Sequence, residues 1–131
     1  MAIQYSTTHR TNAMTTLNTD IGTNAQIIIY SGAVPATVAT APSGTLLVQF
    51  AGNATAFGTV TSGVLTASAV ANVAAAASGT AGYFRINTSA PAAVVQGTCG
   101  TSGTDMILTN TNIASGQTVQ FTSLTITAFG A

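Results

Sequence analysis

The chain has 131 residues, only 3% of them charged, and its formal net charge is zero. Ordinary globular proteins carry about 25% charged residues, and two arginines without a lysine cannot follow a phosphate backbone, so nucleic-acid binding is excluded. With 47% hydrophobic residues the chain is also unlike a disordered one, and its length suits one folded domain.

The first element in chain order is a helix predicted over residues 6–21. Ser6 or Thr7 would cap its N-terminal end. The high threonine content lowers helix propensity, which leaves an extended arm as the alternative. Apolar side chains recur three or four positions apart, as one helix face requires: Met14, Leu17 and Ile21.

The remainder of the chain has the pattern of β-strands. The unbroken apolar run Ile27–Ile29 favours a strand that is covered on both faces. A long loop bounded by Pro, Gly and Ser follows in the stretch SGAVPATVATAPSG. In TLLVQFAG we expect one face to carry Leu46, Val48 and Phe50 and the other to carry Gln49.

The middle of the chain predicts a hairpin and a long alternating strand. NATAFGTVTSGVLTASAV forms the hairpin, with its turn at residues 61–63. The Ala-rich segment Ala74–Ala77 fits either a helix or a loop. In GYFRINTS the side chains alternate, with one face made by Phe84 and Ile86 and the other by Tyr83, Arg85 and Asn87.

The C-terminal third predicts further strands. PAAVVQGTC forms one strand, and GTSG at residues 100–103 is a hairpin turn leading to the strand in DMILTNTNI. After a turn at residues 114–116, the apolar alternation of the last strand changes phase at Thr122–Ser123. One extra residue there would form a β-bulge; the alternative is a strand that is partly buried on both faces.

Turn signals recur about every ten residues, as they do in all-β sandwiches and barrels. We therefore predict an all-β fold, a single-domain β-sandwich of the jelly-roll or immunoglobulin-like type with about seven or eight strands. Residues 1–23 would form an N-terminal arm or short helix, and residues 24–131 the β-sandwich domain.

The side chains that could support catalysis are few and scattered. His9 is the single histidine, Asp20 and Asp105 are the only acids, and no GxSxG turn accompanies them. Cys99 has no base near it in the sequence and suits a small buried apolar position better than a nucleophile. These residues lack metal-ligand spacing. We therefore predict no enzyme activity, no metal and no cofactor.

Arg85 is the one charged residue inside the predicted alternating strand GYFRINTS. Burying a guanidinium without a partner would be costly, so we expect Arg85 to be exposed or paired. Two partners are open to it: Asp105, and a residue of another subunit. A strand-face or intersubunit contact is the role that we predict.

Targeting signals are not apparent. The first ten residues, MAIQYSTTHR, do not form a signal peptide, and the most apolar stretch is too short and too polar for a membrane helix. We therefore expect synthesis in the cytoplasm and no membrane contact. Because zero net charge removes repulsion between copies, the hydroxyl- and amide-rich surface suits contact with other chains.

Several ordered motifs resemble a known group of proteins. They are IIIYSGAVPATVATAPSGTLLVQF, GVLTASAV, GYFRINTSA and the stretch from Val94 to Gly130. Together they resemble small structural proteins of tailed bacteriophages and prophages, over about residues 25–129. The resemblance implies a head decoration or cement protein, located on the capsid surface of the virion and made in the host cytoplasm.

The resemblance also implies partners: the major capsid protein, and further copies of the chain in a dimer or trimer. The N-terminal arm would extend across a neighbouring subunit. Two other functions remain open, a tail, neck or fibre-associated virion protein and a carbohydrate-binding, adhesin-like β-sandwich. The interface residues that we predict are Tyr5, His9, Arg10, Met14, Leu17 and Arg85.

Overall fold

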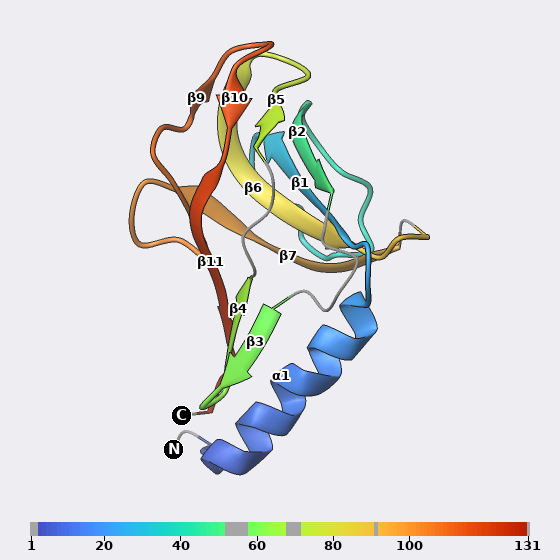
Figure 1. Cartoon of the computed structure of the whole chain (residues 1–131), viewed down its shortest axis with the longest axis vertical. Coiled ribbons are helices and arrows are strands. Elements are labelled where there is room, and N and C mark those ends of the chain that lie inside the picture. The colour runs from blue at the N-terminus through green and yellow to red at the C-terminus, as the bar shows by residue number, and fades with distance from the viewer. Residues whose placement is uncertain (1–2, 52–57, 68–71, 91, 131) are drawn as a thin grey trace.

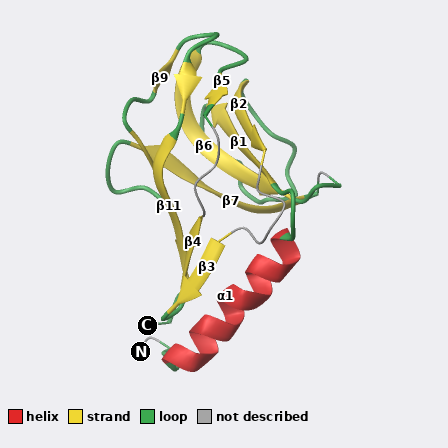
Figure 2. Cartoon of the chain, viewed as in Figure 1, coloured by secondary structure: helices red, strands yellow, loops and turns green. Residues whose placement is uncertain are grey.

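The computed structural model describes residues 3–51, 58–67, 72–90 and 92–130. Strands account for 45% of the described residues, and one helix stands beside them (Figure 2). A mostly β fold is therefore confirmed. The elements are α1 (Thr7–Ile21), β1 (Gln26–Ser31), β2 (Leu46–Ala51), β3 (Gly58–Thr61), β4 (Val64–Ala67), β5 (Val73–Ala74), β6 (Gly79–Asn87), β7 (Ala93–Gly100), β8 (Met106–Leu108), β9 (Asn112–Ile113), β10 (Thr118–Val119) and β11 (Phe121–Thr127).

Nine of these strands form one curled sheet. Its path is β2-β1-β6-β7-β8-β11-β4-β3, with β9 paired to β6, while β10 pairs with β5 separately. The long strand β6 is strongly curved, so the sheet bends around it. The strand β11 runs from the upper part of the molecule down to β4 and β3, beside which α1 lies (Figure 1). The described residues contain eleven strands rather than the seven or eight predicted, because β5, β8, β9 and β10 are pieces of only two or three residues.

The helix α1 forms where the sequence predicts it. The side chain of Ser6 accepts a hydrogen bond from the backbone N–H of His9, which caps the first turn. Ile21 is 1% exposed, and Met14 and Leu17 pack partly buried against the core. The extended-arm alternative is therefore wrong for residues 7–21.

Contacts join α1 to the hairpin of β3 and β4 in the same chain. The Asn18 side-chain amide donates to the Gly58 carbonyl, and the Gly63 N–H donates to the Thr11 hydroxyl. The hairpin turn has Ser62 and Gly63 at positive φ, 51° and 79°, which is the backbone of a tight two-residue hairpin turn. The predicted turn at residues 61–63 is confirmed; the outer parts of that predicted hairpin, residues 53–57 and 68–70, lie outside the described residues.

The isoleucine run in β1 is buried on both faces, as predicted. Ile27 and Ile29 belong to the main core, and Ile28 belongs to a second cluster with Tyr30 and Tyr83. The loop between β1 and β2 covers this second face, because Val34 packs against the cluster.

Arg85 is 3% exposed, so the expectation that it is exposed is wrong, whereas the expectation that it is paired, in a strand-face contact, is confirmed by Gln96 opposite it in β7. Its Nε donates to the Gln96 side-chain oxygen at 3.1 Å, and its Nη2 donates to the Thr40 carbonyl. Gln96 in turn donates to the Pro35 carbonyl at 2.8 Å. The partners of Arg85 are thus neutral groups of its own chain rather than Asp105 or another subunit. They hold the long loop onto the sheet.

The predicted faces of β2 are wrong in part. The register between β1 and β2 shifts at Tyr30, which pairs with Leu46 while Ile29 pairs with Val48. Leu47 is the extra residue of this bulge and is fully buried. As a result Leu46 packs on the second cluster, opposite to Val48, instead of sharing its face.

The segment Ala74–Ala77 is neither a helix nor only a loop. Ala74 belongs to β5, which pairs with β10. The next two N–H groups donate to carbonyls of different segments, Ala75 to Gln117 and Ala76 to Leu47. Because these partners come from β2 and from the segment before β10, the strand cannot extend.

The turn at residues 100–103 is not the predicted hairpin turn, because β7 and β8 run parallel, with Cys99 opposite Met106. The Asp105 carboxylate accepts hydrogen bonds from the N–H and hydroxyl of Thr98, at 3.1 and 3.3 Å. These bonds hold Asp105, just before β8, against Thr98 near the end of β7. From there β8 runs beside β7 in the same direction.

The predicted bulge in β11 is confirmed. The register with β8 shifts between Phe121 and Ser123, which leaves Thr122 as the extra residue. Phe121 and Leu124 therefore both face the core, at 8% and 1% exposed.

Candidate interaction surface

The two ends of the chain meet at the lower end of the molecule. The Tyr5 N–H donates to the Gly130 carbonyl at 2.6 Å, and the Ala128 N–H donates to the Gly63 carbonyl at 2.9 Å. In Figure 1 the N and C labels lie side by side, beside the first turn of α1. These two long-range hydrogen bonds bring Tyr5, the residues before Gly130 and the β3–β4 turn into one place.

This end carries an exposed apolar surface, which we call the terminal patch: Ile3, Tyr5 and Phe129. Their side chains are 74%, 40% and 85% exposed, and among the described residues they are the large hydrophobic side chains that are exposed. Single exposed hydrophobic residues are normal on protein surfaces, and large contiguous apolar patches are typical of interaction sites. Tyr5 and Phe129 line one hollow and Ile3 lies two positions before Tyr5, which makes this end the candidate surface.

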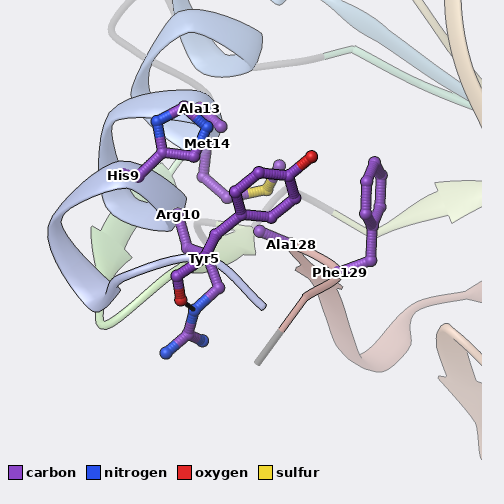
Figure 3. Close-up of a pocket in the computed structure, with 7 residues that line it drawn as sticks. All are labelled: Tyr5, His9, Arg10, Ala13, Met14, Ala128 and Phe129. Carbon is purple, nitrogen blue, oxygen red and sulfur yellow. Dashed lines mark hydrogen bonds between the residues drawn. The ribbon is translucent and has the colours of Figure 1, made fainter. Parts of the chain in front are cut away.

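A small hollow lies within this surface (Figure 3). Its volume is about 160 Å³, and the Tyr5 and His9 rings stand beside it with their centroids 4.9 Å apart. Small-molecule pockets usually measure about 300–1,000 Å³, so the hollow has the size for a protruding side chain of a partner. The lining residues are Tyr5, His9, Arg10, Ala13, Met14, Ala128 and Phe129.

The charge at the hollow is positive. Arg10 donates from Nε to the Tyr5 carbonyl at 3.3 Å and from Nη2 to the Thr7 hydroxyl at 3.1 Å. A guanidinium has five N–H donors, so these two bonds leave further donors for an incoming acceptor. The residues lining the hollow include no carboxylate, and a partner with a carboxylate or carbonyl would fit it.

Most of the predicted interface residues come together here. Tyr5, His9, Arg10 and Met14 line the hollow, and Leu17 follows one turn further along α1. Arg85 lies apart, inside the sheet and its covering loop. Whether these residues contact a partner stays a prediction.

Sequence reasoning missed Ile3 and Phe129. A signal for Phe129 was present: Ala128 shares the inward parity of Leu124 and Ile126, so the next residue must point outward. Ile3 gave no such signal, because it precedes the first periodic element.

The candidate catalytic residues do not form a site in the described part of the chain. Burial raises the pKa of the Cys99 thiol to about 12, with a smaller contribution from the Asp105 charge. The thiol lies 3.7 Å from the Met106 sulfur and is protonated at neutral pH. Asp105 is bonded to Thr98, and Asp20 lies at the far end of α1 from His9. In the same ranges no group of three His, Cys, Asp or Glu residues could hold a metal ion.

A second hollow, of about 450 Å³, lies beside β10 and β11 and is polar. Sugar sites use exposed aromatic rings for stacking, but Phe121 here is 8% exposed and packs edge-on against Phe50. The hollow therefore supports the carbohydrate-binding alternative poorly. Its lining residues are Asn72, Thr109, Thr118, Gln120, Phe121 and Thr122.

Comparisons with protein-family models, with curated proteins and with solved structures found no match to this chain. Over the residues that the structure describes, α1 is not the long apolar helix that crossing a bilayer would require.

Proposed function

We propose that the chain is a structural protein of a tailed-bacteriophage virion, a decoration protein that binds the capsid exterior and stabilises contacts between major capsid subunits. The terminal patch carries this proposal, because it is where the described surface exposes large apolar side chains. The sequence resemblance supplies the kind of particle, and the scarcity of charge suits permanent contact with other chains.

Within the mostly β fold, we also propose that the strands are arranged as a β-sandwich. Phe50 of β2 and Phe121 of β11 meet edge to face, with ring centroids 5.4 Å apart, although four strands separate β2 from β11 along the sheet. A contact between such distant strands supports a sheet that folds over a single core, as the two layers of a sandwich do.

The proposed role is structural rather than catalytic. It needs surface area and shape, and the protonated Cys99 thiol and the Asp105–Thr98 bonds are accounted for by folding. The proposed partners are the major capsid protein and further copies of this chain, with the virion surface as the location.

A cryo-EM map of the virion, with this chain traced in it, tests the proposal. We expect density on the capsid lattice, with Tyr5 and Phe129 at the contact with capsid subunits. Density confined to the tail, neck or fibres would overturn the capsid role and support the virion alternative. A particle without this chain would overturn both.

A binding assay sharpens the test. Purified chain is mixed with heads that lack it, and bound protein is measured after sedimentation. We expect Phe129→Ser to weaken binding and Gln49→Ser to leave it unchanged, since Gln49 is an exposed residue of β2, away from the terminal patch. Equal binding by both variants would contradict a role for the patch.

A further inference from the structure

The two charges of α1 stand at the wrong ends of the helix. The helix dipole favours acidic residues at the N-terminal end and basic residues at the C-terminal end. In α1 the first turn contains no acid and the last turn no base; Arg10 lies near the start and Asp20 is the last residue but one. Both charges therefore oppose the dipole of their own helix.

The same two charges bound a stripe along one flank of α1. Arg10, Ala13, Leu17 and Asp20 follow one another at spacings of three, four and three residues, the spacing by which one helix packs against another. Ala13 and Asp20 are exposed, and Arg10 and Leu17 are partly exposed. The flank is thus exposed at Ala13 and Asp20 and open on one side at Arg10 and at Leu17, which also packs against the core of its own chain.

This stripe is complementary to itself when it is turned end over end. Such a turn exchanges Arg10 with Asp20 and Ala13 with Leu17. In a twofold symmetric interface, a residue that contacts a second residue of the partner is contacted by that second residue in return. The order of the four residues meets this condition with opposite charges at the ends and a small and a large apolar side chain between them.

We propose that two copies of the chain pair through α1, with the helices antiparallel about a twofold axis and Arg10 of each copy bonded to Asp20 of the other. Each charge then also lies beside the helix end that favours it, because antiparallel packing places the two dipoles in opposite directions. Leu17 of the second copy packs on Ala13, whose small side chain lines the hollow beside Tyr5 and Phe129.

The positions of the other charged residues support a second copy of the chain as the partner of α1. Arg85 is bonded internally to Gln96 and the covering loop, and Asp105 is bonded to Thr98. Asp105 is exposed as well, but it lies away from α1, just before β8. On α1 itself the charged residues are Arg10 and Asp20, and they are of opposite sign. A second copy supplies the matching pair.

On the outer surface of α1, three threonine hydroxyls are already bonded within the helix. Its threonines donate their hydroxyls to carbonyls of the preceding turn: Thr15 to Thr11, Thr16 to Asn12 and Thr19 to Thr15. This bonding uses the hydroxyl donors within the helix. The ion pairs at the two ends then determine how the helices align.

Sedimentation of the purified full chain over a range of concentrations tests the pairing, with the variants Arg10→Asp, Asp20→Arg and the two together. We expect a wild-type dimer, and a dissociation constant raised about tenfold or more by either single change, because like charges then meet. The double variant restores the opposite pairing and, we expect, the dimer. Gln49→Asp, which changes the charge elsewhere, is the matched control.

Several results would overturn the proposal: a monomer at every concentration, a trimer, a dimer that the single changes leave intact, or a double variant that stays monomeric. Circular dichroism checks that each variant is folded. Ala13→Arg adds a steric test, since it keeps both original charges but blocks the close approach of the helices. These measurements contain no capsid, so their outcome is separate from that of the proposed function.

Discussion

The two arginines of the chain occupy regions that differ in almost every respect. Arg85 lies under the loop between β1 and β2, where it is 3% exposed and bonded to Gln96 and Thr40. Arg10 lies at the end where the termini meet, next to exposed Tyr5 and Phe129. In a chain with so few charges, one region uses its arginine to hold the fold together and the other leaves its arginine partly exposed at the surface.

Phenylalanine gives the largest contrast between these regions. We expect Phe84→Ala to lower the free energy of unfolding by about 4 kcal/mol, because its side chain is 1% exposed and its removal leaves a cavity. Phe129→Ala should change it by less than about 0.5 kcal/mol, because the side chain is 85% exposed. Urea titration of both variants measures the difference, and similar losses would erase the contrast.

The two arginines should differ in their contribution to stability by a smaller amount than the two phenylalanines. Arg85→Met removes the donor to Gln96 and to the loop carbonyl, and should destabilise the fold by about 2 kcal/mol. Arg10→Met should change stability by no more than about 0.5 kcal/mol, because it loses bonds made near the surface. Limited proteolysis provides a second measurement: cleavage within residues 32–45 should become faster in Arg85→Met alone.

Cys99 extends the comparison to the interior beneath the sheet. Its pKa is raised to about 12 from 9.0, so the folded chain keeps a proton that the unfolded chain loses. Stability from this group is complete below about pH 9 and declines by up to about 1.4 kcal/mol per pH unit as the pH rises toward 12. Urea titrations from about pH 8 to pH 10 should show the decline in the wild type.

The control for this slope is Cys99→Ala. Burial also raises the pKa of Tyr30, with a contribution from Tyr83 that Arg85 partly opposes; its effect remains in the control and is removed by subtraction. A slope that is identical in wild type and Cys99→Ala would show that the thiol titrates normally in the folded chain.

Tyrosine gives the smallest contrast. The Tyr83 hydroxyl donates to the Ser43 carbonyl at 2.7 Å beneath the loop, so Tyr83→Phe should cost about 1 kcal/mol. The Tyr5 side chain is 40% exposed, and Tyr5→Phe should be close to neutral. Thermal unfolding of the two variants, recorded side by side, decides whether the hydroxyls differ as their environments do.

Periodicity in the sequence predicted much of this fold. Ser6 and the spacing of Met14, Leu17 and Ile21 indicated the helix, and the change of phase at Thr122 indicated the bulge in β11. These signals are local, since each depends on residues within a few positions of one another.

The failures involve distant partners. Leu47 bulges because of its register with β1, and Arg85 is buried because a loop some 45 residues away accepts its hydrogen bonds. The parallel direction of β8 is a different case, because the bonds between Asp105 and Thr98 span only seven positions but leave no mark in the alternation of residues. The terminal patch likewise needs both ends of the chain to meet, which no local pattern reports. Composition indicated a surface for contact with other chains, but only the fold locates where apolar residues are exposed on it.

The meeting of Tyr5 and Gly130 has a practical consequence for genetic fusion. A tag or cargo domain attached to either end would emerge at the same place and would cover the terminal patch, the surface that we propose for binding. The turn at residues 114–116, between β9 and β10, lies at the opposite extreme of the molecule (Figure 1). A peptide inserted there would lie at the far end of the molecule and would leave the terminal patch uncovered.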